Sequence, residues 1–177
     1  MKSLRWTFLL ALLLAAALSA CSQAPLKVPL DDFEFKVDAA SYTAGQVIYP
    51  KNPAQFNKPV FNVKTITLSG DVTVEYTAVQ SPLKMTFYAR AENPGDAGCT
   101  DAGLAWVCDA ANETPISSEY TFASGETQQV TLGSPNPEVL ADGINQGEIW
   151  IGAKVTAGAA TNVTFRFTHM VANVTVF

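Results

Sequence analysis

The sequence predicts an all-β fold, an antiparallel β-sandwich of about eight or nine strands with one short crossover helix. Apolar and polar residues alternate with a period of two over several segments, which is the pattern of half-buried strands. Gly, Pro, Asn and Asp separate these segments. The 177-residue chain has only 11 Lys and Arg, and its richness in Thr and Val is typical of exported β proteins. Immunoglobulin-like (Ig-like) and jelly-roll topologies both fit this pattern.

The first twenty residues have the features of an export signal. Lys2 and Arg5 precede an uncharged apolar run from Phe8 to Leu18. This run is shorter than the roughly 20 apolar residues that a membrane-spanning helix needs, and polar residues follow it. We therefore expect a secretory signal peptide over residues 1–20. An uncleaved N-terminal anchor helix is the alternative.

The end of this segment reads Leu18-Ser19-Ala20-Cys21. The order Leu, small residue, Ala or Gly, Cys resembles the lipobox of bacterial lipoproteins, and all four positions match. The resemblance implies that Cys21 receives lipid on its sulfur, and that cleavage before it makes Cys21 the acylated first residue. Two or three acyl chains, such as palmitate, hold a protein on a bilayer. In that family an Asp after the cysteine signals retention at the inner membrane. Ser22 therefore implies the outer membrane if the source has one.

Residues 21–30 are expected to be the lipidated cysteine and a short extended tether, because prolines keep this segment out of a sheet. A single β-sandwich domain is expected over residues 31–177. Its first strand covers residues 33–37, where Phe and Val alternate with charged residues. A weaker strand is expected over 43–49, and a proline-rich loop over 50–59.

The middle of the chain predicts several short strands. Residues 61–68 and 72–76 are expected to form a hairpin around a turn at Ser69-Gly70-Asp71. Ser81-Pro82 should then break the chain before a strand over 83–89. Further short strands are expected at positions 104–108, 120–122 and 127–132.

One helix and the C-terminal strands complete the fold. Asn136-Pro137 suits the start of a helix of one to two turns, and Gly143 suits its end. A strand is expected over 148–156, followed by a turn at Gly158-Ala159-Ala160. Because a single strand over 162–177 would exceed 50 Å at about 3.3 Å per residue, we expect two strands or one long strand with a bulge near residues 169–173.

Charge limits the partners. The formal net charge is −5, and removing residues 1–20 leaves nine basic and sixteen acidic residues, or about −7. This surface argues against nucleic acid, whose phosphates require Lys and Arg. It also does not favour anionic lipid, so acyl chains must supply the membrane attachment. The expected partners are the membrane, through the lipid anchor, and a glycan or an envelope protein.

The two cysteines of the mature chain, Cys99 and Cys108, predict one disulfide in an oxidising compartment. Two free thiols are the alternative. A structural zinc site is disfavoured because it needs four ligands and the chain has one His.

The loop that carries these cysteines is rich in acids. Asp96, Asp101, Asp109 and Glu113, with backbone carbonyls, suggest a calcium site, since calcium takes six to eight oxygens. The spacing does not match an EF-hand, and a solvated loop stapled by the disulfide is the alternative. No other cofactor is expected.

Two tryptophans are candidates for glycan binding. Trp106 lies in the loop region, and Trp150 has outward parity in its strand. Exposed aromatic rings would favour a carbohydrate partner. The alternative is that both rings are buried anchors, because aromatic side chains bury well.

The sequence offers little for catalysis. His169 is the one histidine and has the inward parity of its strand, and no Gly-x-Ser-x-Gly elbow is present. We therefore expect a non-enzyme, namely an exported, lipid-anchored lipoprotein of the cell envelope with a binding or structural role. The alternatives are an envelope polysaccharide hydrolase, a carbohydrate-binding module, or a subunit of an envelope protein complex.

Overall fold

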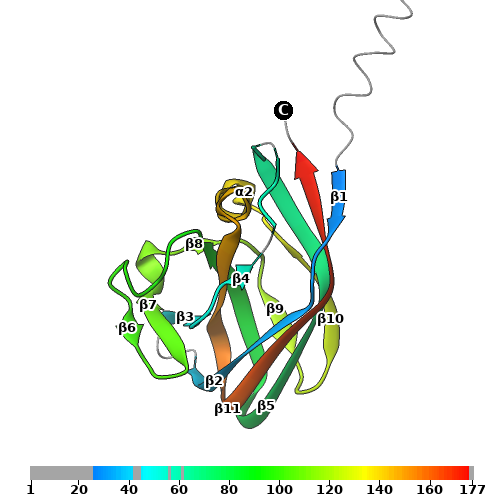
Figure 1. Ribbon diagram of the computed structural model, residues 1–177. Helices are drawn as coiled ribbons and strands as arrows, with labels where there is room; N and C mark the ends of the chain where they lie inside the picture. The colour runs from blue at the N-terminus through cyan, green and yellow to red at the C-terminus, as the bar shows by residue number, and fades with distance from the viewer. Residues whose placement is uncertain (1–25, 42–44, 56, 61, 176–177) are drawn as a thin grey trace, which may run out of the picture.

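The computed structural model (Figure 1) describes residues 26–41, 45–55, 57–60 and 62–175. The expected signal peptide over 1–20 and the expected lipidation site Cys21 lie outside these residues. Within these residues, eleven strands form one antiparallel sheet that folds over into a sandwich, and one short α-helix connects two of them. The predicted all-β class is therefore confirmed. In the part of the chain described, no helix has the length and apolar character needed to cross a membrane.

The element bounds are as follows. The strands are β1 (Leu26–Pro29), β2 (Phe33–Ser41), β3 (Gln46–Pro50), β4 (Ala54–Gln55), β5 (Thr65–Arg90), β6 (Thr100–Asp101), β7 (Ala105–Asp109), β8 (Thr114–Pro115), β9 (Tyr120–Phe122), β10 (Thr127–Leu132) and β11 (Glu148–Thr175). The 3₁₀ turn η2 (Ala110–Asn112) follows β7, and the helix α2 (Pro137–Gln146) precedes β11. The sheet order is β10-β5-β11-β3-β7-β6, with β1, β2 and β4 also on β11 and β8 and β9 also on β5.

Two long strands organise the sandwich. β5 has 26 residues and β11 has 28, and they pair antiparallel from Arg90 opposite Trp150 to Thr65 opposite Thr175. Both strands bend at the bottom of Figure 1, where the register shifts between Val155 and Ala160. Each strand therefore contributes to both layers of the sandwich. β1, β2 and β10 flank one half of the pair, and β3, β4, β8 and β9 flank the other.

The predicted hairpin turn at Ser69-Gly70-Asp71 is wrong, because β5 runs through it. Gly70 is buried and pairs with β10 at Val130. A Cβ on Gly70 would lie 2.9 Å from the Cα of Met170. The glycine therefore serves a close approach between strands, which local sequence does not distinguish from a turn.

The other expected breaks in the long strands are also wrong. β5 passes through Ser81-Pro82, and β11 passes through Gly158-Ala159-Ala160. Gly158 has a φ of +89°, which only glycine adopts easily, and this absorbs the bend of β11. The alternative of one long C-terminal strand with a bulge is confirmed by a register shift between Thr168 and Val171. Because the bulge turns His169 outward, its side chain is 82% exposed, and the expected inward position is wrong.

Helix α2 begins as predicted, with Asn136 at the N-cap position and Pro137 in the first turn. Its predicted end at Gly143 is wrong, because α2 continues to Gln146 and Gly147 caps it with a φ of +88°. Gly143 is instead buried against Ile149, whose side chain leaves no room for a Cβ.

The expected tether over 21–30 is also corrected, because residues 26–29 form β1. This strand pairs with the last part of β11, from Leu26 opposite Val174 to Pro29 opposite Val171. Proline is tolerated there because β1 pairs on one side with β11 and its other side carries no strand in the sheet described.

The main core lies between the two layers. Phe33 stacks on Phe167 with ring centroids 4.4 Å apart, and Phe35 stacks on Phe165 at 4.6 Å. The alternation predicted for residues 33–37 is thus confirmed, because these rings point inward and the charged residues point outward.

Candidate functional site

A groove of about 640 Å³ opens at the end of the sandwich where β1 begins. β1, the last part of β11, the loop over residues 57–60 and helix α2 all contribute to its walls. In Figure 1 the start of β1, the end of β11 and α2 lie at this same end of the molecule. The lining residues are Leu26, Val28, Pro29, Leu30, Asp31, Gln55, Asn57, Lys58, Pro59, Val60, Val63, Ile144, Ala172 and Val174.

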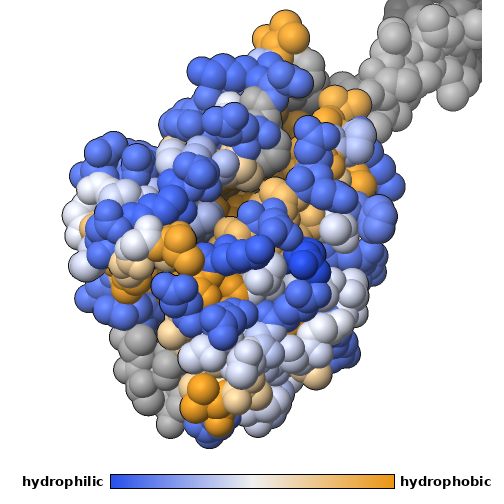
Figure 2. Space-filling model, turned by 60° about the horizontal axis from the view of Figure 1, so that its bottom comes forward, coloured by the Kyte–Doolittle hydropathy of each residue, from blue (hydrophilic) through white to orange (hydrophobic). Residues whose placement is uncertain are grey.

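Apolar side chains make up most of this lining. Ala172 and Val174 are buried, as the alternation of β11 places them toward the core. Leu26 is 48% exposed, Val28 37% and Val60 fully exposed. These three are among the five exposed large hydrophobic residues of the described chain. Figure 2 shows some hydrophobic atoms at the end of the molecule where β1 begins, and others scattered over the face turned toward the viewer. Grouped exposure of this kind marks interaction sites in soluble proteins.

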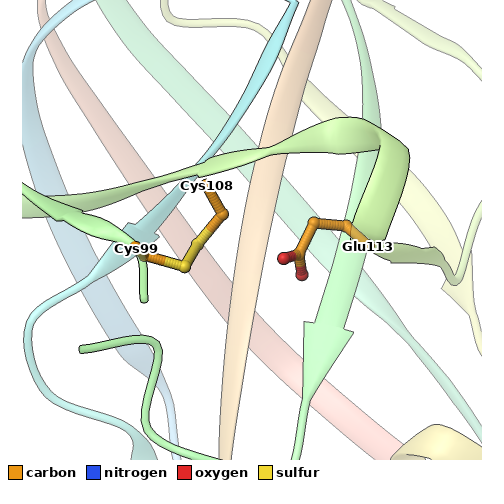
Figure 3. A group of neighbouring side chains, drawn as sticks. All are labelled: Cys99, Cys108 and Glu113. Atoms are coloured by element: carbon orange, nitrogen blue, oxygen red, sulfur yellow. A yellow bond between two sulfur atoms is a disulfide. The ribbon is translucent and has the colours of Figure 1, made fainter. Parts of the chain in front are cut away.

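A second feature is the disulfide between Cys99 and Cys108, which confirms the predicted pair. It lies beside a smaller apolar cluster that contains Val47, Tyr49, Tyr88, Cys108 and Trp150. Figure 3 shows the carboxylate of Glu113 facing the two sulfur atoms.

Glu113 is a buried carboxylate with two partners. Its side chain is 2% exposed, Arg90 lies 3.4 Å from one oxygen, and the hydroxyl of Tyr49 donates to the other at 2.7 Å. Burial, together with the nearby Glu113, raises the pKa of Tyr49 far above its ordinary value and also raises the pKa of Tyr88. Because Glu113 is paired with a cation and a donor, the cluster links β3, β5 and the disulfide loop and does not present a free base.

The four acids proposed for calcium do not converge. In the described residues the one group of three or more potential ligands is Cys99, Cys108 and Glu113, and its cysteines are bonded to each other. Asp101 pairs with Lys51, which lowers the pKa of that carboxyl, and accepts from the backbone of Gly103.

The remaining two acids lie on the surface. Asp109 accepts from the backbone of Ala111 at the start of η2, and Asp96 is exposed. Asp96, Asp101 and Asp109 thus lie on a solvated loop stapled by the disulfide, as in the alternative, whereas Glu113 is buried.

Neither tryptophan presents an open ring face. Trp150 is 4% exposed, within the smaller cluster. Trp106 is partly buried, with the ammonium of Lys51 3.4 Å from its ring centroid and Gly95 packed against the ring. Both rings thus act as anchors. The outward parity of Trp150 was misleading, because the β3–β7 part of the sheet covers the Trp150 ring.

The groove was not predicted from the sequence. The signal that could have indicated it is the alternation Leu26-Lys27-Val28, which two neighbouring prolines led us to interpret as a tether. Val60 could not be assigned to the groove, because no pattern in the proline-rich loop indicates which of its residues face the sandwich.

No protein-family model and no curated protein matches this chain. Several solved structures are similar in architecture. A Bacillus endospore appendage that forms disulfide-linked pili is 12% identical, with a TM-score of 0.32. The match covers 86% of this chain and 89% of the appendage chain. The xylan-binding module CBM15 is 10% identical, with a TM-score of 0.37, and the match covers 85% of this chain and 97% of the module. A Clostridium thermocellum xylanase 10B with a CBM22-1 module is 9% identical, with a TM-score of 0.35, and the match covers 85% of this chain and 26% of the xylanase chain. At these scores the likenesses carry no argument about function.

Proposed function

We propose that this protein is a lipid-anchored lipoprotein of the bacterial cell envelope that binds an apolar ligand in the groove beside β1. Cys21 carries the lipid and holds the domain at the membrane surface. The observation that supports binding is the grouping of Leu26, Val28 and Val60 around a groove of about 640 Å³. This volume lies within the roughly 300–1,000 Å³ of small-molecule sites, which are mostly apolar with a few polar groups.

Four of the lining residues are polar, and polar groups form a substantial part of the groove surface. Lys58 and Asp31 are the charged members, with Gln55 and Asn57 as amides. An alkyl chain with a small polar head suits this composition. A glycan ligand is less well supported, because Trp106 and Trp150 are covered by their own chain.

A thermal-shift measurement on residues 22–177 tests the proposal. A saturating alkyl ligand, such as a medium-chain fatty acid, should raise the melting temperature. Ligand at a hundredfold over its Kd adds about 2.7 kcal/mol, which for a domain of this size corresponds to roughly 5–10 °C. Calcium, EDTA and envelope polysaccharides are expected to leave the melting temperature unchanged.

A matched pair of variants locates the site. Leu26→Asp with Val60→Asp places two carboxylates in the groove and should abolish the shift. Leu104→Asp with Val79→Asp changes the same residue types at exposed positions outside the groove, 56% and 70% exposed, and should retain it. A shift with polysaccharide but none with the alkyl ligand would instead support a carbohydrate-binding module.

A further inference from the structure

We propose that the groove beside β1 is occupied by an acyl chain attached to Cys21 of the same molecule, so that the lipid anchor fills its own protein's binding site. The proposal rests on the proposed function, because it requires both a lipidated Cys21 and a groove that accepts alkyl chains. It adds that external ligands must displace this chain.

The distance along the chain favours this occupant. Leu26 is the first residue of β1 and lines the groove. Five residue steps separate it from Cys21, a reach of at most about 17 Å. An acyl chain spans one leaflet, which is about half of a hydrocarbon core about 30 Å thick. The length of the acyl chain is therefore similar to the reach from Cys21 to Leu26. A chain bonded to Cys21 can therefore pass Leu26 and enter the groove.

The short connection also favours the attached chain over a free one. A ligand joined to its site by a short linker has an effective concentration in the millimolar range. A free fatty acid competes from solution and has no such advantage. Moving one chain from the bilayer to the groove exchanges one apolar environment for another, and the remaining chains on Cys21 keep the protein at the membrane.

The exposed apolar residues fit the same occupant. Leu26, Val28 and Val60 line the groove, whereas Val79 and Leu104 do not. Exposed apolar residues grouped around one groove indicate a surface that is covered in the working protein. An acyl chain attached at Cys21, before Leu26 in the sequence, would cover these exposed residues first.

Photo-crosslinking of the full-length protein in its own envelope tests the proposal. Cells are fed a fatty acid that carries a photoactivatable diazirine, so that the label enters Cys21 through lipidation, and intact envelopes are irradiated. The protein is digested with trypsin and the crosslinked peptides are identified by mass. We expect the Cys21 peptide joined to tryptic peptides 28–36, 52–64 or 167–177, which contain the groove residues.

The matched variants separate groove binding from chance contact. Leu26→Asp with Val60→Asp should lower the yield of these crosslinks about tenfold, because a carboxylate beside an alkyl chain weakens binding by at least that factor. Leu104→Asp with Val79→Asp should leave the yield unchanged. The fraction of protein in the envelope serves as a check that both variants fold and are exported.

Three other outcomes would overturn the proposal, each for a different reason. Crosslinks from Cys21 only to phospholipid would place all its chains in the bilayer. Groove peptides joined to phospholipid rather than to Cys21 would show that the occupant comes from the bilayer, which leaves the proposed function intact. No label on Cys21 before irradiation would exclude lipidation, and the proposed anchoring would fail with it.

Discussion

At the scale of single residues, the pair of Tyr49 and Glu113 stabilises the junction between the sandwich and the disulfide loop. Tyr49 is fully buried, and its hydroxyl is one of two partners of the buried carboxylate. A buried charge that loses a partner bears a desolvation cost, which is larger than the net value of the hydrogen bond itself.

Tyr49→Phe should therefore lower the free energy of unfolding by about 1–3 kcal/mol, measured by urea denaturation at pH 7. Tyr120→Phe is the matched control, because its hydroxyl bonds to the backbone of Thr131 at an exposed position. It should change stability by less than about 0.5 kcal/mol. Equal effects of the two substitutions would show that Glu113 does not depend on Tyr49.

The raised pKa of Tyr49 adds a pH dependence. An unfolded tyrosine ionises near pH 10, whereas burial and Glu113 keep Tyr49 protonated in the folded protein well above that pH. Its contribution to stability is therefore complete below about pH 10 and is lost as the pH rises further. Between pH 10 and 11, wild type should lose about 1 kcal/mol more than Tyr49→Phe. Parallel curves would contradict the shift.

At the scale of elements, the alternation in the sequence predicted where strands lie but not where they end. The strands near residues 33–37, 104–108, 120–122 and 127–132 were all found close to their expected positions. The long strands were not foreseen, because the glycines at positions 70 and 158 look like turn residues in a local pattern. Their role depends on Met170 and on the bend of β11, which are distant in sequence.

The candidate site was less predictable than the fold. The disulfide followed from counting cysteines, which is a property of the whole sequence. The burial of Trp150 and the exposure of His169 depend on which strands cover each face and on a bulge, so parity alone gave the wrong side. The groove depends on β1 pairing with a strand about 145 positions later, which no local pattern contains.

The continuity of β5 can be tested at Gly70. Gly70→Val should lower the free energy of unfolding by about 3 kcal/mol, because the new side chain meets the backbone of Met170 in a filled space. Ser69→Val introduces the same side chain one position earlier, on the other face of the strand, and should be tolerated within about 0.5 kcal/mol. Denaturation curves measure both. If Gly70→Val were as stable as wild type, an open turn at residues 69–71 would explain it better.

At the scale of the whole molecule, the groove lies at the end of the domain nearest in sequence to the proposed lipid attachment at Cys21. The start of β1, the end of β11 and α2 meet there (Figure 1), and five residue steps separate Leu26 from Cys21. The proposed anchor would therefore hold the groove within about 17 Å of the bilayer surface. An acidic surface gives no attraction to anionic lipid, so in the proposed lipoprotein the acyl chains would supply nearly all of the attachment.

The intact mass of the protein extracted from the envelope tests this account most directly. We predict a chain that begins at Cys21 and carries the added mass of a diacylglyceryl group and an amide-linked acyl chain, and a Cys21→Ser protein that lacks this mass and remains uncleaved. An unmodified chain that begins upstream or downstream of Cys21 would contradict the account, since the domain would then have no lipid to hold it at the membrane or to fill its groove.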